Sequence, residues 1–116
     1  MSSQDTPSGL TDAQYDQIIR ETLARIESTV DRWLDEDVAD IDAARTGGML
    51  TLALPNRSQL IINAQPPLHE LWLAAKRGGF HFSTRRKAPG LTPSQAKSFA
   101  LLSACASEQL GKPLKF

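Results

Sequence analysis

Cysteine, histidine and aromatic residues are all scarce in this chain. Its 116 residues include one cysteine and two histidines, and aromatic side chains make up 6%. Cys105 cannot form a disulfide within the chain, and no cysteine or histidine accompanies it at metal-ligand spacing, which argues against zinc or iron–sulfur ligation by this chain alone. So little cysteine is typical of a reducing compartment.

Long apolar runs and a basic, apolar leader are also missing. The first nine residues, MSSQDTPSG, are polar and acidic, and no apolar run approaches the roughly 18 residues of a membrane span. We therefore expect an untargeted cytoplasmic protein with no membrane partner and a disordered N-terminus over residues 1–10. Residues 11–116 are expected to form a single domain, because a hydrophobic content of 41% suits one compact core.

Charge is abundant but unevenly distributed. Eleven of the thirteen acidic residues lie in positions 1–42, whereas ten of the thirteen Lys and Arg residues follow them. The net charge of zero therefore divides into −8 (3 against 11) and +8 (10 against 2). A negative pole can collect cations, and both poles can attract charged partners, although two merely solvated faces would give the same pattern.

The first helix is predicted from a capping box and an apolar stripe. Thr11 can cap the helix, with Gln14 three residues later, and about 22 helical residues follow. The stripe predicted to be buried consists of Tyr15, Ile18, Ile19, Leu23, Ile26, Val30, Trp33 and Leu34.

Acidic residues gather where they weaken this helix. Glu27, Asp31 and Asp35 follow one another at intervals of four, and like charges at that spacing destabilise a helix by about 0.2–0.5 kcal/mol per pair. Acids at the C-terminal end also oppose the helix dipole. Several acids at positions that lower helix stability, all toward one end of the helix, indicate that they serve a function.

After Val38 the apolar period changes from helical spacing to two. Alternation and Gly, Pro and Asn turns predict five strands, at about 39–44, 49–54, 58–65, 68–75 and 80–84. A second helix is predicted from Pro93, capped by Thr92 and Gln95, to Leu110, with Gly111 as its stop. It is expected to bury Phe99, Leu102, Cys105, Ala106 and Leu110. The fold class is therefore α+β, a two-layer sandwich with both helices on one face of an antiparallel sheet.

One aromatic residue falls on the polar face of this sheet. Trp72 alternates with Leu71 and Leu73, so it shares a face with Asn63 and Gln65. A large aromatic in a polar patch is typical of a binding anchor. The alternative is that the ring points into the core.

Nucleophilic catalysis is not expected. His69 and His81 lie in predicted strands, where hydrogen-bonded sheet residues are commoner than ligands. Cys105 has no positioned base, and no helical Glu-x-x-His pair suggests a diiron site. We therefore expect a binding protein rather than an enzyme, and the sequence specifies no ferroxidase centre.

Residues 47–82, GGMLTLALPNRSQLIINAQPPLHELWLAAKRGGFHF, closely resemble the frataxin family, specifically its bacterial CyaY-type branch. The Gly-Gly turn, the IIN-x-Q-x-P strand end, the WLA strand and the GG-aromatic-H-F strand carry the resemblance, which extends over about residues 12–111. It implies an α/β sandwich that binds iron and regulates, or donates iron to, the cysteine desulfurase and scaffold protein of iron–sulfur cluster assembly. It also implies a monomer that iron can drive to oligomerise.

The resemblance implies iron, as Fe²⁺ or Fe³⁺, held weakly by carboxylates of the first helix and first strand. Such oxygen ligands on a surface give shallow, hydrated sites with little metal selectivity. The expected ligands are Glu27, Asp31, Asp35, Glu36, Asp37, Asp40 and Asp42, and the expected partner-binding residues are Asn63, Gln65 and Trp72.

The sequence departs from the family in two places. Ser28, Thr29 and Arg32 interrupt the acidic series, so a lower iron capacity is expected. Residues 85–91, RRKAPGL, stand where relatives carry a sixth strand, so that strand is expected to be short or missing.

Two other functions remain open. A protein-interaction adaptor without a metal role is the stronger alternative. Binding of single-stranded nucleic acid through Trp72 and the basic residues is less favoured, because only one platform aromatic is present and the acidic half would repel a phosphate backbone.

Overall fold

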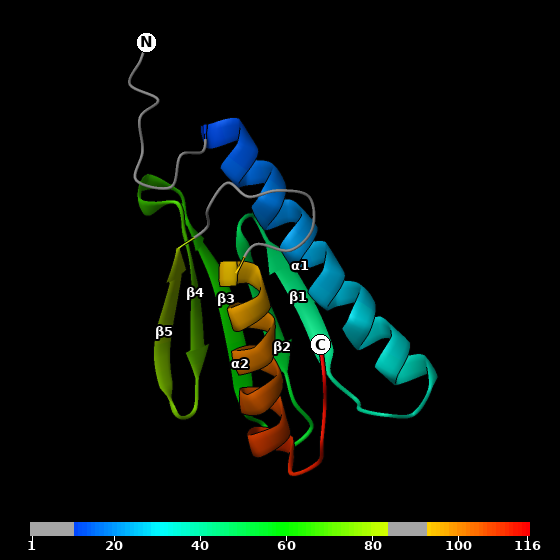
Figure 1. The fold of residues 1–116 in the computed structure, drawn as a ribbon. Coiled ribbons are helices and arrows are strands. Elements are labelled where there is room, and N and C mark those ends of the chain that lie inside the picture. Colours follow the sequence, from blue (N-terminus) through cyan, green and yellow to red (C-terminus); the bar gives the residue numbers. More distant parts are fainter. Residues whose placement is uncertain (1–10, 84–92) are drawn as a thin grey trace.

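The computed structural model describes residues 11–83 and 93–116. Two long helices enclose a run of strands in the sequence (Figure 1). In chain order the elements are α1 (Asp12–Asp35), β1 (Asp42–Thr46), β2 (Met49–Ala53), β3 (Gln59–Gln65), the 3-10 helix η1 (Pro66–Leu68), β4 (Glu70–Ala75), β5 (Gly78–Ser83) and α2 (Pro93–Leu110).

The five strands form one antiparallel sheet in sequence order, β1-β2-β3-β4-β5. Short connections join neighbouring strands, with η1 between β3 and β4, and the β1–β2 turn shows why glycine is needed there. Gly47 has a φ of 58°, a left-handed conformation that glycine adopts without steric cost. A Cβ on Gly48 would lie 3.0 Å from the Ala64 Cβ, so the chain also needs a glycine for this close approach to β3.

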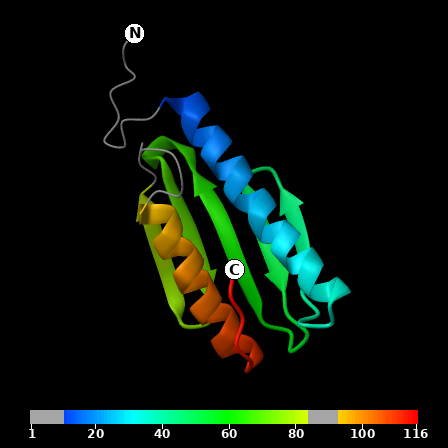
Figure 2. The same cartoon turned by 45° about the vertical axis from the view of Figure 1, so that its right-hand side comes forward.

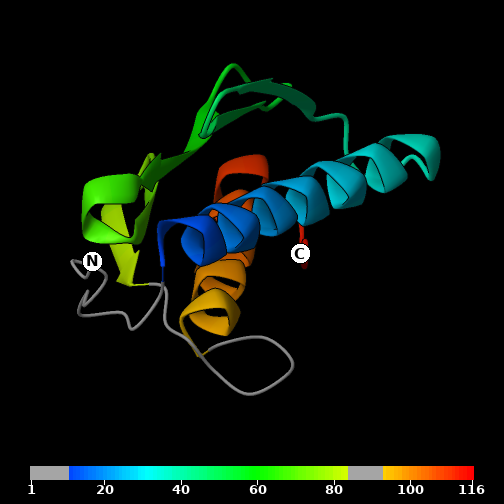
Figure 3. The ribbon, with the colours of Figure 1, turned by 90° about the horizontal axis from the view of Figure 1, so that it is seen from above.

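Both helices cover the same face of the sheet, as the view along the layers shows (Figure 3). Between them lies one hydrophobic core, to which α1, α2 and the sheet contribute. Its most completely buried large side chains are Leu23, Ile26, Val30, Ile41, Leu50, Leu52, Leu60 and Cys105. The predicted two-layer α+β sandwich is confirmed, and the other sheet face carries no helix among the described residues.

The segment after α2 returns to pack on the core (Figure 2). Gly111 has a φ of 78° and ends the helix, as the sequence predicts. Leu114 is buried, and the Phe116 ring lies 4.7 Å from the Trp33 ring, tilted by 54°. The last residues therefore belong to the folded structure, because they cover the end of α1 that carries Trp33.

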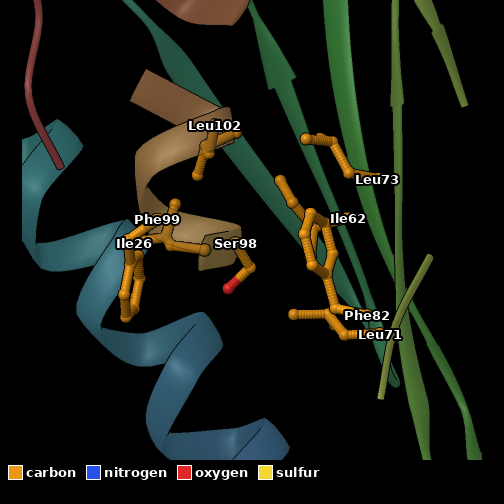
Figure 4. Close-up of a pocket in the computed structure, with 8 residues that line it drawn as sticks. All are labelled: Ile26, Ile62, Leu71, Leu73, Phe82, Ser98, Phe99 and Leu102. Carbon is orange, nitrogen blue, oxygen red and sulfur yellow. The ribbon is translucent and has the colours of Figure 1, made fainter. Parts of the chain in front are cut away.

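A narrow apolar pocket remains between the helices and the sheet (Figure 4). Phe99 and Leu102 of α2 face Ile62 and Leu73 across it. Its volume is about 10 Å³, about the space that one water molecule needs. The pocket is a packing gap in the core and is too small to hold a ligand.

Local sequence signals mark the first helix correctly. The Thr11 side chain accepts from the Gln14 backbone N–H at 3.1 Å, and Gln14 Oε1 accepts from the Thr11 N–H at 2.9 Å. Seven members of the predicted stripe are buried or packed against the core, but Leu34 is 48% exposed. The prediction was wrong for Leu34, which lies one residue before the helix ends.

Three boundary predictions need correction. The fifth strand begins at Gly78 and not at residue 80, because Gly78 and Gly79 both pair with β4. The fourth strand begins at Glu70 and not at residue 68, because Pro66–Leu68 form η1 and His69 caps it with a φ of 50°. The first strand begins at Asp42, although Ala39 and Ile41 are buried before it as expected. In α2, Leu110 is only partly buried, whereas the other four predicted core residues are buried.

Several predictions fall outside the described residues. They are the disordered segment 1–10, the fate of a sixth strand at 85–91, and the Thr92–Gln95 cap of α2. No helix within the described ranges is long and apolar enough to cross a bilayer.

Candidate functional site

The predicted iron ligands form a strip along α1, the α1–β1 connection and the start of β1. We call this strip the acidic surface; it consists of Glu27, Asp31, Asp35, Glu36, Asp37, Asp40 and Asp42. All of them are exposed except Glu27, which is half-buried. Helical spacing puts Glu27, Asp31 and Asp35 on one side of α1, and Figure 2 shows β1 alongside the same helix.

Glu27 differs from the other six because it already has a cationic partner. The Arg45 Nη1 atom of β1 donates to Glu27 Oε1 at 2.9 Å, and both side chains are about 70% shielded from solvent, with exposures of 28% and 30%. This ion pair ties β1 to α1. A metal ion at Glu27 would compete with Arg45 for the carboxylate charge, so the structure makes Glu27 the least available ligand of the set.

The α1–β1 connection holds Asp37 in an unusual backbone conformation. The Val38 N–H donates to the Trp33 carbonyl at 2.7 Å and the Asp37 N–H to the Leu34 carbonyl at 3.3 Å, the hydrogen-bond pattern of a Schellman motif. Asp37 occupies the left-handed position with a φ of 57°, where glycine is usual. An acid kept there despite the backbone strain is consistent with a role for its carboxylate.

A shallow pocket of about 350 Å³ lies beside this connection. Asp37 and Asp40 line it together with Lys112, which follows α2. The Lys112 ammonium donates to the Val38 carbonyl. One of the chain's own cations is therefore bound at the acidic surface, next to two of the predicted ligands.

The carboxylates do not converge on a single point. Within residues 11–83 and 93–116, no group of three or more His, Cys, Asp or Glu side chains is arranged to hold a metal ion. The acidic surface therefore presents separate carboxylates to solvent. Such an arrangement attracts cations through its summed charge and supplies the oxygen ligands that hard cations prefer.

Trp72 lies on the sheet face opposite the helices. It alternates with Leu71 and Leu73, which are 5% and 4% exposed, so the predicted face is correct and the alternative of a core position is wrong. Strand register aligns Met49, Asn63, Trp72 and His81 in one row across β2 to β5. Gln65 lies on the same face, opposite Glu70.

Two neighbours fix the Trp72 ring: Glu70, which strand alternation places on the same face, and His81, which the sequence interpretation missed. Its Nε1–H donates to Glu70 Oε1 at 2.8 Å, and the His81 ring stacks on it at 4.3 Å with 5° between the planes. The same Glu70 oxygen lies 3.9 Å from His81 Nδ1. The register of the β4–β5 hairpin could have revealed His81, since its turn at Lys76–Arg77 places the two rings opposite each other.

The other histidine has a structural position. His69 is 3% exposed and stacks on Tyr15 at 4.7 Å, while its Nε2 lies 2.9 Å from Asp12 Oδ1. The Tyr15 hydroxyl donates to the Glu70 carbonyl at 2.6 Å and accepts from the Gln65 N–H at 2.9 Å. These contacts join the start of α1 to the β3–β4 connection.

Burial changes two acid–base equilibria inside the fold. Burial raises the pKa of Tyr15 to about 12. It also raises the pKa of the Cys105 thiol, which lies fully buried in α2. A buried thiol held in its neutral form is a poor nucleophile.

The fold and the site together define a class of protein. It is a small two-layer α/β sandwich with a carboxylate-rich first helix and an open sheet face that presents a fixed tryptophan. The frataxin-like domain family matches residues 8–112 of this chain. The chain belongs to the frataxin family.

Individual relatives agree with this assignment. The "Iron-sulfur cluster assembly protein CyaY" of Polaromonas sp. (strain JS666) is 50% identical over 107 residues, which cover 92% of each chain. The protein of the same name from Albidiferax ferrireducens is 46% identical over 105 residues, 90% of this chain and 96% of the relative. The solved structure of a frataxin from Psychromonas ingrahamii gives a TM-score of 0.64 at 26% identity, covering 91% of this chain and 97% of that one.

Proposed function

We propose that this protein binds iron weakly on its acidic surface and regulates iron–sulfur cluster assembly according to iron supply. The machinery it would act on is the cysteine desulfurase and the scaffold protein, either as their regulator or as an iron donor. Two relatives named as iron–sulfur cluster assembly proteins cover nearly the whole chain, which supports this process. On this proposal the protein acts in the cytoplasm as a monomer that iron can drive to oligomerise.

The placement of the exposed acids carries the iron part of the proposal. Asp31 and Asp35 repel each other one turn apart on α1, and Asp37 adds a strained backbone at the C-terminal end of the helix. Each feature lowers stability. A bound cation would offset the repulsion, so these positions fit a site whose occupancy depends on the iron concentration.

A second candidate is a protein-interaction adaptor without a metal role. Two observations favour it: the carboxylates of the described residues do not form a ready metal cluster, and Trp72 is held in a fixed orientation on the open face. Docking through Asn63, Gln65 and Trp72 is compatible with both candidates. The metal role is therefore the feature to test.

Thermal unfolding with added cations separates the two candidates. An ion at ten times its Kd stabilises the folded state by about 1.4 kcal/mol, which corresponds to a rise of roughly 5–6 °C in Tm. We expect such a rise with Fe²⁺ under anaerobic conditions, and with Mn²⁺ or Ca²⁺, beyond the effect of NaCl at matched ionic strength. No excess rise with any of these ions would leave the adaptor function.

A pair of variants locates the effect. Asp31→Asn with Asp35→Asn should keep or slightly raise the basal Tm, because repulsion is removed, and should reduce the cation-induced rise. Asp16→Asn is the matched control on the same helix, since Asp16 already pairs with Arg20 at 3.0 Å. If the control lowers the cation effect as much as the double variant, the ions do not bind at the acidic surface.

A further inference from the structure

A second charged feature lies on the open sheet face, at the end where the β2–β3 and β4–β5 turns meet. A shallow hollow of about 420 Å³ opens there. Arg57 and Lys76 line its edge, and Ile61 and Ala74 of neighbouring strands line its floor. Figure 1 shows both turns at the same end of the sheet as the C-terminal end of α2. We call this hollow the basic hollow.

The cations of the basic hollow have no carboxylate partner among the described residues, unlike Arg20, Arg45 and Arg77. Arg20 and Arg45 form ion pairs with acids, and Arg77, next to Lys76, pairs with Glu108 at 3.7 Å. Within the part of the chain that the structure describes, no ion pair involves Arg57 or Lys76, and both residues are exposed. Their charges are therefore available to an anionic ligand.

A buried side chain holds the two turns together. Gln109 of α2 is 9% exposed; its Nε2 donates to Ser58 Oγ at 3.0 Å, and its Oε1 accepts from the Lys76 N–H at 2.7 Å. Asn56 Nδ2 in turn donates to the Gln109 carbonyl. The turn that carries Arg57 and the turn that carries Lys76 are thus fixed relative to each other, which lowers the entropic cost of binding between them.

We propose that the basic hollow binds a carboxylate of an acidic segment of a protein partner that lies across the open sheet face. Two cations favour an anion, and the apolar floor favours a ligand that continues as a chain over Ile61 and Ala74. Along β4, Lys76 follows Trp72 by four residues, a distance of about 13 Å at strand spacing. An extended segment of a few residues can therefore contact both places.

Binding at the basic hollow depends neither on iron nor on the acidic surface. Nothing in it requires a metal ion, and the hollow lies on the strongly basic part of the sequence, residues 43–116. A failure of the iron proposal would leave it standing, and the reverse also holds.

Chemical-shift mapping of the ¹⁵N-labelled protein with a capped acidic peptide tests the proposal. The probe contains two Asp residues separated by Ser, and the control peptide has Asn in their place. We expect shift changes at the amides of Arg57, Ser58 and Lys76 with the acidic peptide and none with the control peptide. An equal response to both peptides, or no response at these amides, would overturn the proposal.

Three variants make the test specific. Arg57→Gly suits the Arg57 backbone, whose φ is 71°, so it removes the guanidinium without harm to the fold. Arg57→Gly and Lys76→Gln should each weaken peptide binding by about two- to fivefold, whereas Arg77→Gln, the paired neighbour, should not. Equal weakening by Arg77→Gln would show that the peptide is attracted to the basic half in general, and would overturn specific binding at the basic hollow.

Two further arms distinguish other occupants. Inorganic phosphate at the same charge concentration should shift the three amides less than the peptide does, because it makes no contact with the apolar floor; an equal or larger shift would make the hollow a small-anion site. Raising the protein concentration alone should not shift them. A shift on concentration would assign the hollow to the acidic surface of a second copy and overturn the proposal.

Discussion

The two tryptophans of the chain should respond very differently to truncation. Trp72→Ala removes a stacked contact with His81 and one hydrogen bond to Glu70, both on a partly exposed face. Stacking contributes about 0.5–1.5 kcal/mol and the hydrogen bond about 0.5–1.5 kcal/mol. The expected loss in the free energy of unfolding is therefore about 1–3 kcal/mol, with the lower half favoured because solvent replaces the lost contacts.

Trp33 provides the internal comparison. It is 5% exposed and packs against Phe116, so Trp33→Ala should cost about 3–5 kcal/mol, the range for deleting a buried aromatic. Urea unfolding followed by far-ultraviolet circular dichroism measures both values. A Trp72→Ala protein as destabilised as Trp33→Ala would refute the placement of Trp72 on the open face. A folded Trp72→Ala protein that binds desulfurase and scaffold as tightly as the parent would remove its docking role.

Three more predictions concern the ends of α1 and the Tyr15 hydroxyl. Asp37→Gly should raise the free energy of unfolding by about 0.5–1 kcal/mol, because glycine suits the left-handed position, yet should weaken cation binding; unchanged stability in urea unfolding would contradict the strain. Lys112→Met should enlarge the cation-induced rise in Tm, because it removes the ammonium bound at the acidic surface. Lys115→Met in the same C-terminal segment should enlarge it less. Equal effects of the two variants would contradict a local role for Lys112. Since the pKa of Tyr15 is raised from 10.0 to about 12 in the folded protein, its contribution is complete below pH 10 and is lost as the pH rises toward 12, by about 2 kcal/mol; Tyr15→Phe should flatten this decline in pH-dependent unfolding, and an equally steep decline would contradict it.

Local and periodic features could be predicted from the sequence. The capping box at Thr11 and Gln14 depends on residues three apart, and the face of Trp72 depends on alternation with Leu71 and Leu73. Both follow from geometry within one element. The predicted burial of Leu34 was wrong because helical periodicity does not show where a helix extends beyond the core it packs on. In the last turn of α1 this side chain is 48% exposed.

Contacts between distant segments could not be predicted in this way. Glu27 and Arg45 are 18 residues apart, and the availability of Glu27 as a ligand depends on that contact. Gln109 bonds to Ser58 in the β2–β3 turn, 51 residues away. From the sequence alone it is only a polar residue of the predicted second helix. The left-handed conformation of Asp37 could not be predicted either, because the residue that takes this conformation after a helix is usually glycine.

The rate of cluster formation in a reconstituted desulfurase and scaffold system tests iron-dependent regulation by this protein most directly. It should be measured across Fe²⁺ concentrations with the parent protein, with the Asp31→Asn and Asp35→Asn double variant, and with Trp72→Ala. We expect the parent protein to change the rate to an extent that depends on iron, the double variant to weaken this dependence, and Trp72→Ala to reduce the effect at every iron concentration. A parent protein without effect at any iron concentration, or a double variant with the same iron dependence as the parent, would contradict iron-dependent regulation through the acidic surface.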